Sequence, residues 1–208
     1  MELKDVKCFL LDMDGTFYLG DRIIEGSMEF LQKVEQTGRS YLFLTNNSSR
    51  SVQHYVEKLG RLGLHVGEDK ILTSGQAAAQ YLKREYPGKR VFLLGNPSLR
   101  EEMEKHGIAL EDEHPDLVLV GFDTTLDYAK MTRVCDLVRE GLPYIATHPD
   151  FNCPTESGFI PDIGAIMAFI EASTGRKADV IIGKPCGEIV RAAQERTGLA
   201  PGEMAMVG

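Results

Sequence analysis

The sequence predicts an α/β fold in which parallel strands are covered by helices on both faces. Short apolar segments alternate with longer segments of helical periodicity along the whole chain. Strands that read as continuous apolar runs are typical of parallel sheets buried on both sides. Three of these runs end in polar clusters, as strands of a doubly wound sheet do beside a ligand.

The expected strands are short apolar runs, and they occupy residues 6–12, 41–45, 90–94, 117–120, 144–146, 180–182 and 204–207. The first expected helix, residues 26–36, carries Phe30, Leu31 and Val34 at helical spacing and is followed by Gly38, a common helix stop. The remaining expected helices occupy residues 49–62, 75–85, 98–106, 125–139, 164–173 and 187–197.

Two further segments are predicted to lack regular structure. Residues 70–73 form a short apolar link, and residues 150–161 form the longest irregular segment of the chain. Loops of that length are often functional.

Composition limits the classes of partner. The chain has 208 residues, of which 43% are hydrophobic and 26% charged, as in an ordinary globular protein. A net charge of −8 argues against a nucleic acid, which favours a basic surface. No apolar run approaches the ~20 residues of a membrane helix, and the start lacks the pattern of a signal peptide. We therefore expect a cytoplasmic protein with neither a nucleic acid nor a membrane as partner.

The four cysteines do not indicate a metal cluster, because no pair has the spacing of a CxxC motif. Cys8 and Cys135 lie in apolar patterns, and we expect both to be reduced core residues.

Two acids follow the first predicted strand directly. In the run Asp12-Met13-Asp14-Gly15, the carboxylates are two residues apart and the glycine allows a sharp turn. Asp12 could then act as a nucleophile and Asp14 as a proton donor and acceptor. A loop with solvated acids is an equally frequent interpretation of this pattern alone. A calcium loop is excluded, since its sixth position would be Phe17 and its twelfth Ile23.

Polar clusters also follow two later strands. Thr45, Asn46 and Asn47 precede a predicted helix, where hydroxyls and free N–H groups can bind an anion, although such residues also serve as ordinary helix caps. Lys184 follows the strand at 180–182; a single such lysine is more often a surface residue. The recurrence of polar clusters at three strand ends favours one shared site.

The segments FLLDMDGT, LFLTNN and IIGKP occur in this order and resemble the first three motifs of the haloacid dehalogenase (HAD) superfamily. Within it, the chain is similar over essentially its whole length to the subfamily with a class II, type A cap. That subfamily includes NagD-like nucleotide phosphatases, phosphoglycolate and pyridoxal phosphate phosphatases, and 4-nitrophenylphosphatases.

The resemblance implies a Rossmann-like core and an inserted α/β cap. Asp12 and Thr45 are too close in sequence for a domain to lie between them, whereas the stretch from Thr45 to Lys184 is long enough. The expected core comprises residues 1–72 and 180–208, and the expected cap residues 73–179. Relatives often pair through their caps, so a homodimer is expected by analogy.

The resemblance also implies a magnesium-dependent phosphatase that acts on a small phosphorylated metabolite, such as a nucleotide, sugar or aryl phosphate. Asp12 would form an aspartyl-phosphate, and Asp14 would protonate the leaving alcohol and then activate water. Mg²⁺ would bind a carboxylate oxygen of Asp12 and the backbone carbonyl of Asp14. The residues implied to contact substrate are Gly15, Thr45, Asn46, Asn47, Asp150 and Lys184.

The fourth family motif supplies a further metal-binding acid, which is expected after Gly208 and is not in this chain. The last part of the core is likewise missing. We therefore expect this polypeptide to bind magnesium weakly, to expose its last strand as an edge, and to be nearly inactive, in contrast to a longer parent.

The cap is expected to select the substrate through residues 150–166. Asp150, Asn152 and Cys153 are the candidates there, although a loop residue without ligand contact is the more frequent case, and His148 is more often structural. Two alternatives stay open: a HAD phosphotransferase, and a phosphate-binding or regulatory protein without turnover.

Overall fold

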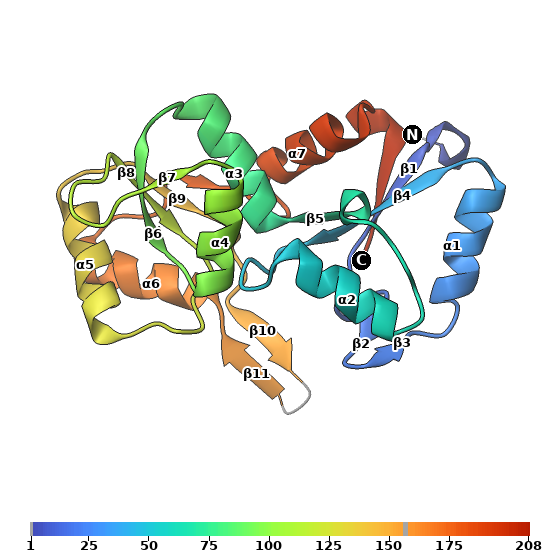
Figure 1. Ribbon diagram of the computed structural model, residues 1–208, viewed down its shortest axis with the longest axis horizontal. Coiled ribbons are helices and arrows are strands. Elements are labelled where there is room, and N and C mark those ends of the chain that lie inside the picture. Colours follow the sequence, from blue (N-terminus) through green and yellow to red (C-terminus); the bar gives the residue numbers. More distant parts are fainter. Residues whose placement is uncertain (1, 156–157) are drawn as a thin grey trace. The chain divides into compact units, whose positions relative to one another are not determined.

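The computed structural model describes residues 2–155 and 158–208, which form two compact units (Figure 1). The first unit takes in the chain up to Thr45, Val52–Thr73 and Val190–Gly208. The second takes in Asn46–Ser51 and Ser74–Ile189.

The first unit is built on a four-stranded parallel sheet. In spatial order its strands are β13 (Met204–Val207), β1 (Cys8–Leu11), β4 (Ser40–Thr45) and β5 (Ile71–Thr73). The residues of β5 were expected to be a link and instead pair with the end of β4. Their apolar character therefore comes from burial in a sheet.

Helices and one small hairpin complete this unit. They are α1 (Ser27–Gln36), α2 (Val52–Arg61), the part of α7 (Gly187–Thr197) from Val190 onward, and the hairpin of β2 (Tyr18–Leu19) and β3 (Arg22–Ile23). Phe9 and Phe43 point from β1 and β4 into one core cluster with α1 and α2. The alternating residues Leu10 and Leu42 are also buried. The sheet is thus covered on both faces, as predicted.

The second unit contains a five-stranded parallel sheet. In spatial order its strands are β12 (Val180–Ile181), β9 (Tyr144–Ala146), β8 (Leu117–Val120), β6 (Arg90–Leu94) and β7 (Ala109–Leu110). Its helices are α3 (Ser74–Glu85), α4 (Pro97–Lys105), α5 (Tyr128–Arg139) and α6 (Ile163–Thr174). Helices α5 and α6 pack together on one side of this sheet (Figure 1).

The two units divide the chain differently from the expected core and cap. Residues 180–189 were expected in the core with 1–72, whereas β12 pairs with β9 in the second sheet. The backbone ladder continues past the strand, because the Gly183 N–H donates to the Thr147 carbonyl at 2.8 Å. This pairing holds the segment before Lys184 within the second unit, together with residues 46–51.

The segment at 150–161, expected to be irregular, is largely an antiparallel hairpin. Its strands are β10 (Asn152–Thr155) and β11 (Gly158–Pro161), and residues 156 and 157 lie outside the described residues. All residues of β11 are exposed, including the apolar Phe159 and Ile160, and the Gly158 and Pro161 that flank them are typical of a loop, which explains why the strand was missed.

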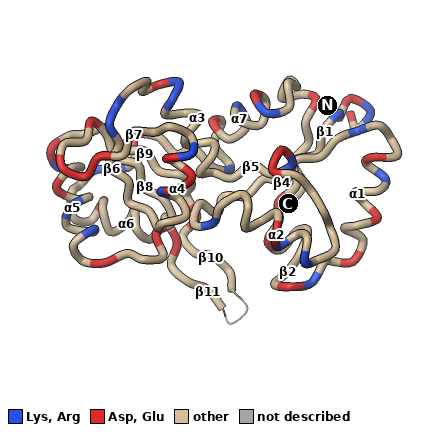
Figure 2. Tube along the Cα trace, viewed as in Figure 1, with Lys and Arg blue, Asp and Glu red and all other residues tan. Residues whose placement is uncertain are grey.

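The distribution of charged residues and the hydropathy of the helices are those of an ordinary globular composition, as far as the structure describes the chain. Acidic and basic residues are interleaved over both units (Figure 2). In the part of the chain that the structure describes, no helix has the length and hydropathy of a membrane span. Cys8 and Cys135 are buried, unpaired thiols, as predicted.

Candidate active site

Asp12 lies where β1 ends, in the first unit. Its N–H donates to the Val207 carbonyl of β13 at 2.9 Å, which continues the parallel ladder beyond Leu11. The half-buried Asp12 lines a pocket of about 250 Å³ with Thr16, Phe17 and other residues of this unit. The sheet therefore fixes the main chain of Asp12 at the wall of this pocket.

A tight turn follows and exposes Asp14. The Met13 carbonyl accepts hydrogen bonds from the N–H groups of Thr16, Phe17 and Tyr18 at 3.3, 2.9 and 3.1 Å. Gly15 has a φ of +85°, a left-handed conformation that glycine adopts without strain. The predicted role of Gly15 in the turn is confirmed.

Two residues that the sequence did not indicate contact Asp14. The Tyr18 hydroxyl donates to Asp14 Oδ2 at 3.3 Å, and Lys58 Nζ lies 3.6 Å from Asp14 Oδ1. The Lys58 ammonium also lies 4.0 Å from the centre of the Tyr18 ring, a cation–π contact. Burial raises the pKa of Tyr18, and the negative charge of Asp14 raises it further. Tyr18 is therefore a neutral donor to the second acid.

Thr45 is the last residue of β4 and is 4% exposed. It pairs with Thr73 of β5 at the same end of the sheet at which Asp12 follows β1. The next residue, Asn46, already belongs to the second unit.

Asn46 joins two other predicted site residues within the second unit. Its Oδ1 accepts from the Lys184 N–H at 2.7 Å, and its Nδ2 donates to the Lys184 carbonyl at 3.1 Å. The same Nδ2 donates to Asp150 Oδ2 at 3.0 Å. One amide thus fixes the main chain of Lys184 and one oxygen of Asp150.

Asp150 is ionised in this setting. Burial pushes the pKa of its carboxyl upward, but the neighbouring His148 and Asn46 side chains outweigh burial and hold the pKa below its usual value. The charge of Lys184 acts in the same direction.

The glycine of the third motif is explained by close packing. A Cβ atom at Gly183 would lie 2.5 Å from Asn46 Oδ1, 2.6 Å from His148 Cβ and 2.9 Å from the Thr147 carbonyl oxygen. A side chain at this position would therefore separate Asn46 from Lys184.

Asn47 has a local partner. Its Oδ1 accepts from the N–H and the hydroxyl of Ser49, both at 2.8 Å. This is an Asx turn in the loop ahead of α2, which begins at Val52, so Asn47 is not the N-cap of that helix. A contact of Asn47 with substrate stays a prediction.

The predicted residues thus form two groups. Asp12, Asp14, Gly15 and Thr45 lie in the first unit, and Asn46, Asn47, Asp150 and Lys184 lie in the second.

The oxygen donors of the first group suit a magnesium ion. Among the described residues, no three or more His, Cys, Asp or Glu side chains converge on one point. The Asp14 backbone oxygen accepts none of the backbone hydrogen bonds of its turn, whereas that of Met13 accepts three. One carboxylate and one carbonyl of this kind fit Mg²⁺, which binds few protein oxygens and keeps several waters.

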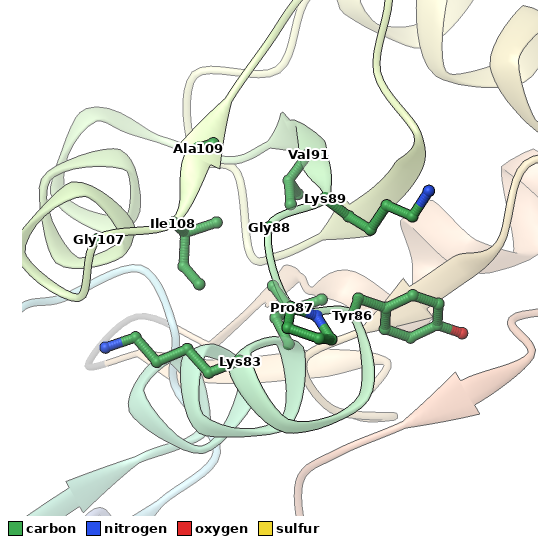
Figure 3. Close-up of a pocket in the computed structure, with 10 residues that line it drawn as sticks. Lys83, Tyr86, Pro87, Gly88, Lys89, Val91, Gly107, Ile108 and Ala109 are labelled. Carbon is green, nitrogen blue, oxygen red and sulfur yellow. The ribbon is translucent and has the colours of Figure 1, made fainter.

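A separate pocket of about 220 Å³ lies in the second unit, between the connections that lead into β6 and β7 (Figure 3). None of the predicted site residues lines it. Its two cations, Lys83 and Lys89, extend in opposite directions (Figure 3). They do not form a common anion site.

Comparison with known proteins gives one consistent family. The model of the family described as haloacid dehalogenase-like hydrolase matches residues 9–109. An acid sugar phosphatase from Staphylococcus aureus is 36% identical over 207 residues, which cover 99% of this chain and 80% of that protein.

Comparison with solved structures gives the same family. A 4-nitrophenylphosphatase from Thermotoga maritima has a TM-score of 0.96 and 47% identity, over 99% of this chain and 79% of the other. A p-nitrophenyl phosphatase from Archaeoglobus fulgidus has a TM-score of 0.90 and 34% identity, over 96% and 77%.

Proposed function

The chain belongs to the haloacid dehalogenase-like hydrolases, and we propose that it hydrolyses small phosphate monoesters through a covalent phosphate on Asp12. It is a phosphoric monoester hydrolase by its similarity to phosphatases over nearly its whole length. The observation that carries the mechanism is the pair of acids after β1, with Asp12 fixed in the sheet and Asp14 turned outward at Gly15.

The first step is attack by a carboxylate oxygen of Asp12 on phosphorus. The bond from phosphorus to the ester oxygen breaks, and the leaving alcohol takes a proton from Asp14. In the second step Asp14 accepts a proton from water, which attacks phosphorus and releases phosphate and free Asp12. Asp14 thus returns to its starting state.

The contacts of Asp14 suit this alternation. The Tyr18 hydroxyl holds Oδ2, while Oδ1 faces Lys58 at 3.6 Å. Neither contact buries the carboxylate, whose side chain is 43% exposed. Asp14 can therefore exchange protons with an alcohol and with water.

Negative charge on the phosphoryl group must be balanced, because a carboxylate approaches a phosphate dianion. We assign this role to Lys184, to the Thr45 hydroxyl and to backbone N–H groups near Asn46 and Asn47. Mg²⁺ would be held by a carboxylate oxygen of Asp12 and the Asp14 carbonyl, and when bound it would neutralise charge on the phosphate.

Sugar phosphates and aryl phosphates are the first substrate classes to test. The names of the relatives point to them: an acid sugar phosphatase and two nitrophenylphosphatases. Nucleotides remain a third class within the same proposal. Asp150 is a further residue of the second unit that we assign to substrate binding.

The test is a phosphatase screen of the full-length protein over sugar, aryl and nucleotide monoesters, with Mg²⁺ and with a chelator. Asp12→Asn is expected to abolish turnover, because an amide cannot form an aspartyl-phosphate. Asp21→Asn, an exposed acid beside the β2–β3 turn, is the matched control and should retain full activity. Undiminished hydrolysis by Asp12→Asn would refute the mechanism.

Two other functions are separated by the same assay. A phosphotransferase would transfer the phosphoryl group to an added alcohol in preference to water. A phosphate-binding protein would bind inorganic phosphate with Mg²⁺ yet release no alcohol from any ester.

A further inference from the structure

A fully buried histidine lies between two carboxylates in the second unit. His148 follows β9 and is 0% exposed. Its Nδ1 lies 3.5 Å from Asp150 Oδ2, and its Nε2 lies 3.5 Å from Asp162 Oδ1. Asp162 is itself buried, whereas the Asp150 side chain is 45% exposed. The ring therefore connects a buried acid to one that can reach a ligand.

Among residues 2–155 and 158–208, the two acids are the charged partners of His148. Neither ring nitrogen makes a hydrogen bond of good geometry to any described residue. Buried polar atoms are costly without a partner, and the two carboxylates are the groups within ion-pair distance. An imidazole donates from one nitrogen when neutral and from both when charged, so it can contact the acids in either form.

The two acids mark the base of the β10–β11 hairpin. Asp150 precedes the hairpin and Asp162 follows it. The Asp162 N–H donates to the Phe151 carbonyl at 3.0 Å, and the Gly164 N–H donates to the Asp150 carbonyl at 2.7 Å. Asp162 Oδ1 also caps helix α6 through the Ile163 N–H at 2.6 Å. The side-chain contacts of His148 thus reinforce a base already joined by its backbone.

From Asp150 the contacts continue to Lys184. Asp150 Oδ2 is the atom that both His148 Nδ1 and Asn46 Nδ2 face, at 3.5 and 3.0 Å. Asn46 in turn binds both the N–H and the carbonyl of Lys184. A shift of the Asp150 carboxylate would therefore disturb the amide that holds the Lys184 main chain.

We infer that His148 is a positioning residue for substrate binding: it fixes the Asp150 carboxylate at the hairpin base and, through Asn46, the main chain of Lys184. The inference rests on the proposed function, in which Asp150 and Lys184 contact the phosphate ester. It assigns His148 no part in the chemical step, because the residue is inaccessible to substrate. The pKa of Asp150 is held low by this neighbourhood, and burial raises the pKa of Asp162.

Two substitutions separate the contacts of the ring. In His148→Asn the amide nitrogen can occupy the place of Nδ1 and keep a donor toward Asp150. In His148→Gln it reaches the place of Nε2 and keeps a donor toward Asp162 only. We expect KM for 4-nitrophenyl phosphate to rise about tenfold in His148→Gln, because the 3.5 Å contact between Nδ1 and Asp150 Oδ2 is lost. The KM of His148→Asn should stay much closer to that of the unchanged protein. The kcat should change little in either variant.

The matched control is His106, whose Nε2 lies 2.9 Å from Glu102 Oε1 in another histidine–acid pair of the same unit. His106→Gln should leave KM unchanged. Equal KM values for His148→Asn and His148→Gln would overturn the inference, since a merely structural ring would not distinguish them.

A double-mutant cycle tests the route through Asp150. Asp150→Asn keeps the shape of the side chain and should raise KM about tenfold by itself. Adding His148→Gln to it should then have little further effect, because the position that His148 fixes no longer carries a charge. Independent, multiplying effects would contradict the inference. If His148 variants do not fold, an unchanged KM in Asp150→Asn would overturn it alone.

Failure of the proposed function would look different. If the unchanged protein released no nitrophenol, calorimetry with inorganic phosphate would replace KM in the same comparisons. Weaker phosphate binding in His148→Gln than in His148→Asn would support the positioning role without turnover, and equal binding would refute it.

Discussion

The Tyr18 hydroxyl donates a hydrogen bond of 3.3 Å to Asp14 Oδ2, although Tyr18 is fully buried and the Asp14 side chain is 43% exposed. The turn closed by hydrogen bonds to the Met13 carbonyl brings the side chains of Asp14 and Tyr18 together. A buried neutral donor therefore orients the exposed acid that we assign to proton transfer.

Removing this hydroxyl should slow the chemical step. We expect Tyr18→Phe to lower kcat by about three- to tenfold, the value of one hydrogen bond, with little change in KM. Steady-state kinetics with 4-nitrophenyl phosphate measure both constants. Tyr41→Phe, at another buried tyrosine of the same core cluster, is the control and should retain kcat. A wild-type kcat in Tyr18→Phe would show that the contact does not matter for turnover.

Removing the Asn46 amide should affect both stability and activity. Asn46→Ala leaves the N–H and carbonyl of Lys184 and one Asp150 oxygen without their partner. The loss of these partly buried hydrogen bonds should lower the free energy of unfolding by about 2–3 kcal/mol. Urea denaturation gives this value, and kinetics on the folded fraction should show a raised KM. An unaltered unfolding midpoint would contradict the contacts described.

Adding one methyl group at Gly183 should destabilise the second unit. The new Cβ would meet Asn46 Oδ1, His148 Cβ and a carbonyl oxygen, all at less than 3 Å. We expect Gly183→Ala to cost about 3 kcal/mol of unfolding free energy. Gly187→Ala is the control, because its Cβ would meet nothing within 4 Å and alanine favours the start of α7. The two variants should shift the urea midpoint in opposite directions.

Acid should weaken one ion pair at the N-terminal ends of the adjacent strands β6 and β8. The Arg90 side chain and N–H hold the pKa of Asp116 at about 2, below its ordinary value of 3.8. A lowered pKa in the folded state stabilises the protein above the ordinary value, and this stabilisation is lost as the pH falls from 3.8 toward 2. The difference in melting temperature between the protein and Asp116→Asn should therefore be constant near neutrality and shrink across that interval. A difference that grows on acidification would contradict the assignment.

The strands that the sequence predicted well are those buried on both faces. Residues 117–120 and 144–146 are β8 and β9 at their observed bounds, because every side chain in them is apolar and buried. The strands of the β10–β11 hairpin were missed because their exposed residues do not alternate between apolar and polar, and because Pro154, Gly158 and Pro161 are typical of loops.

The site was predictable where neighbours in sequence form it. Asp12, Asp14 and Gly15 belong to one turn, so their spacing alone indicated a pair of acids at a strand end. Lys58 on α2 and Asp162 at the start of α6 were not found. Each is an ordinary residue of its own helix or cap, and only the folded chain brings it to Asp14 or to His148.

The strands of the β10–β11 hairpin are exposed, whereas the base of the hairpin is held by hydrogen bonds. The Gly164 N–H and Asp162 fix where β10 and β11 begin and end, while nearly every side chain along the two strands is exposed. Substitutions along these strands should cost little folding stability, because they remove few packed atoms. Selection could thus vary the surface of the hairpin and leave intact the base that holds Asp150.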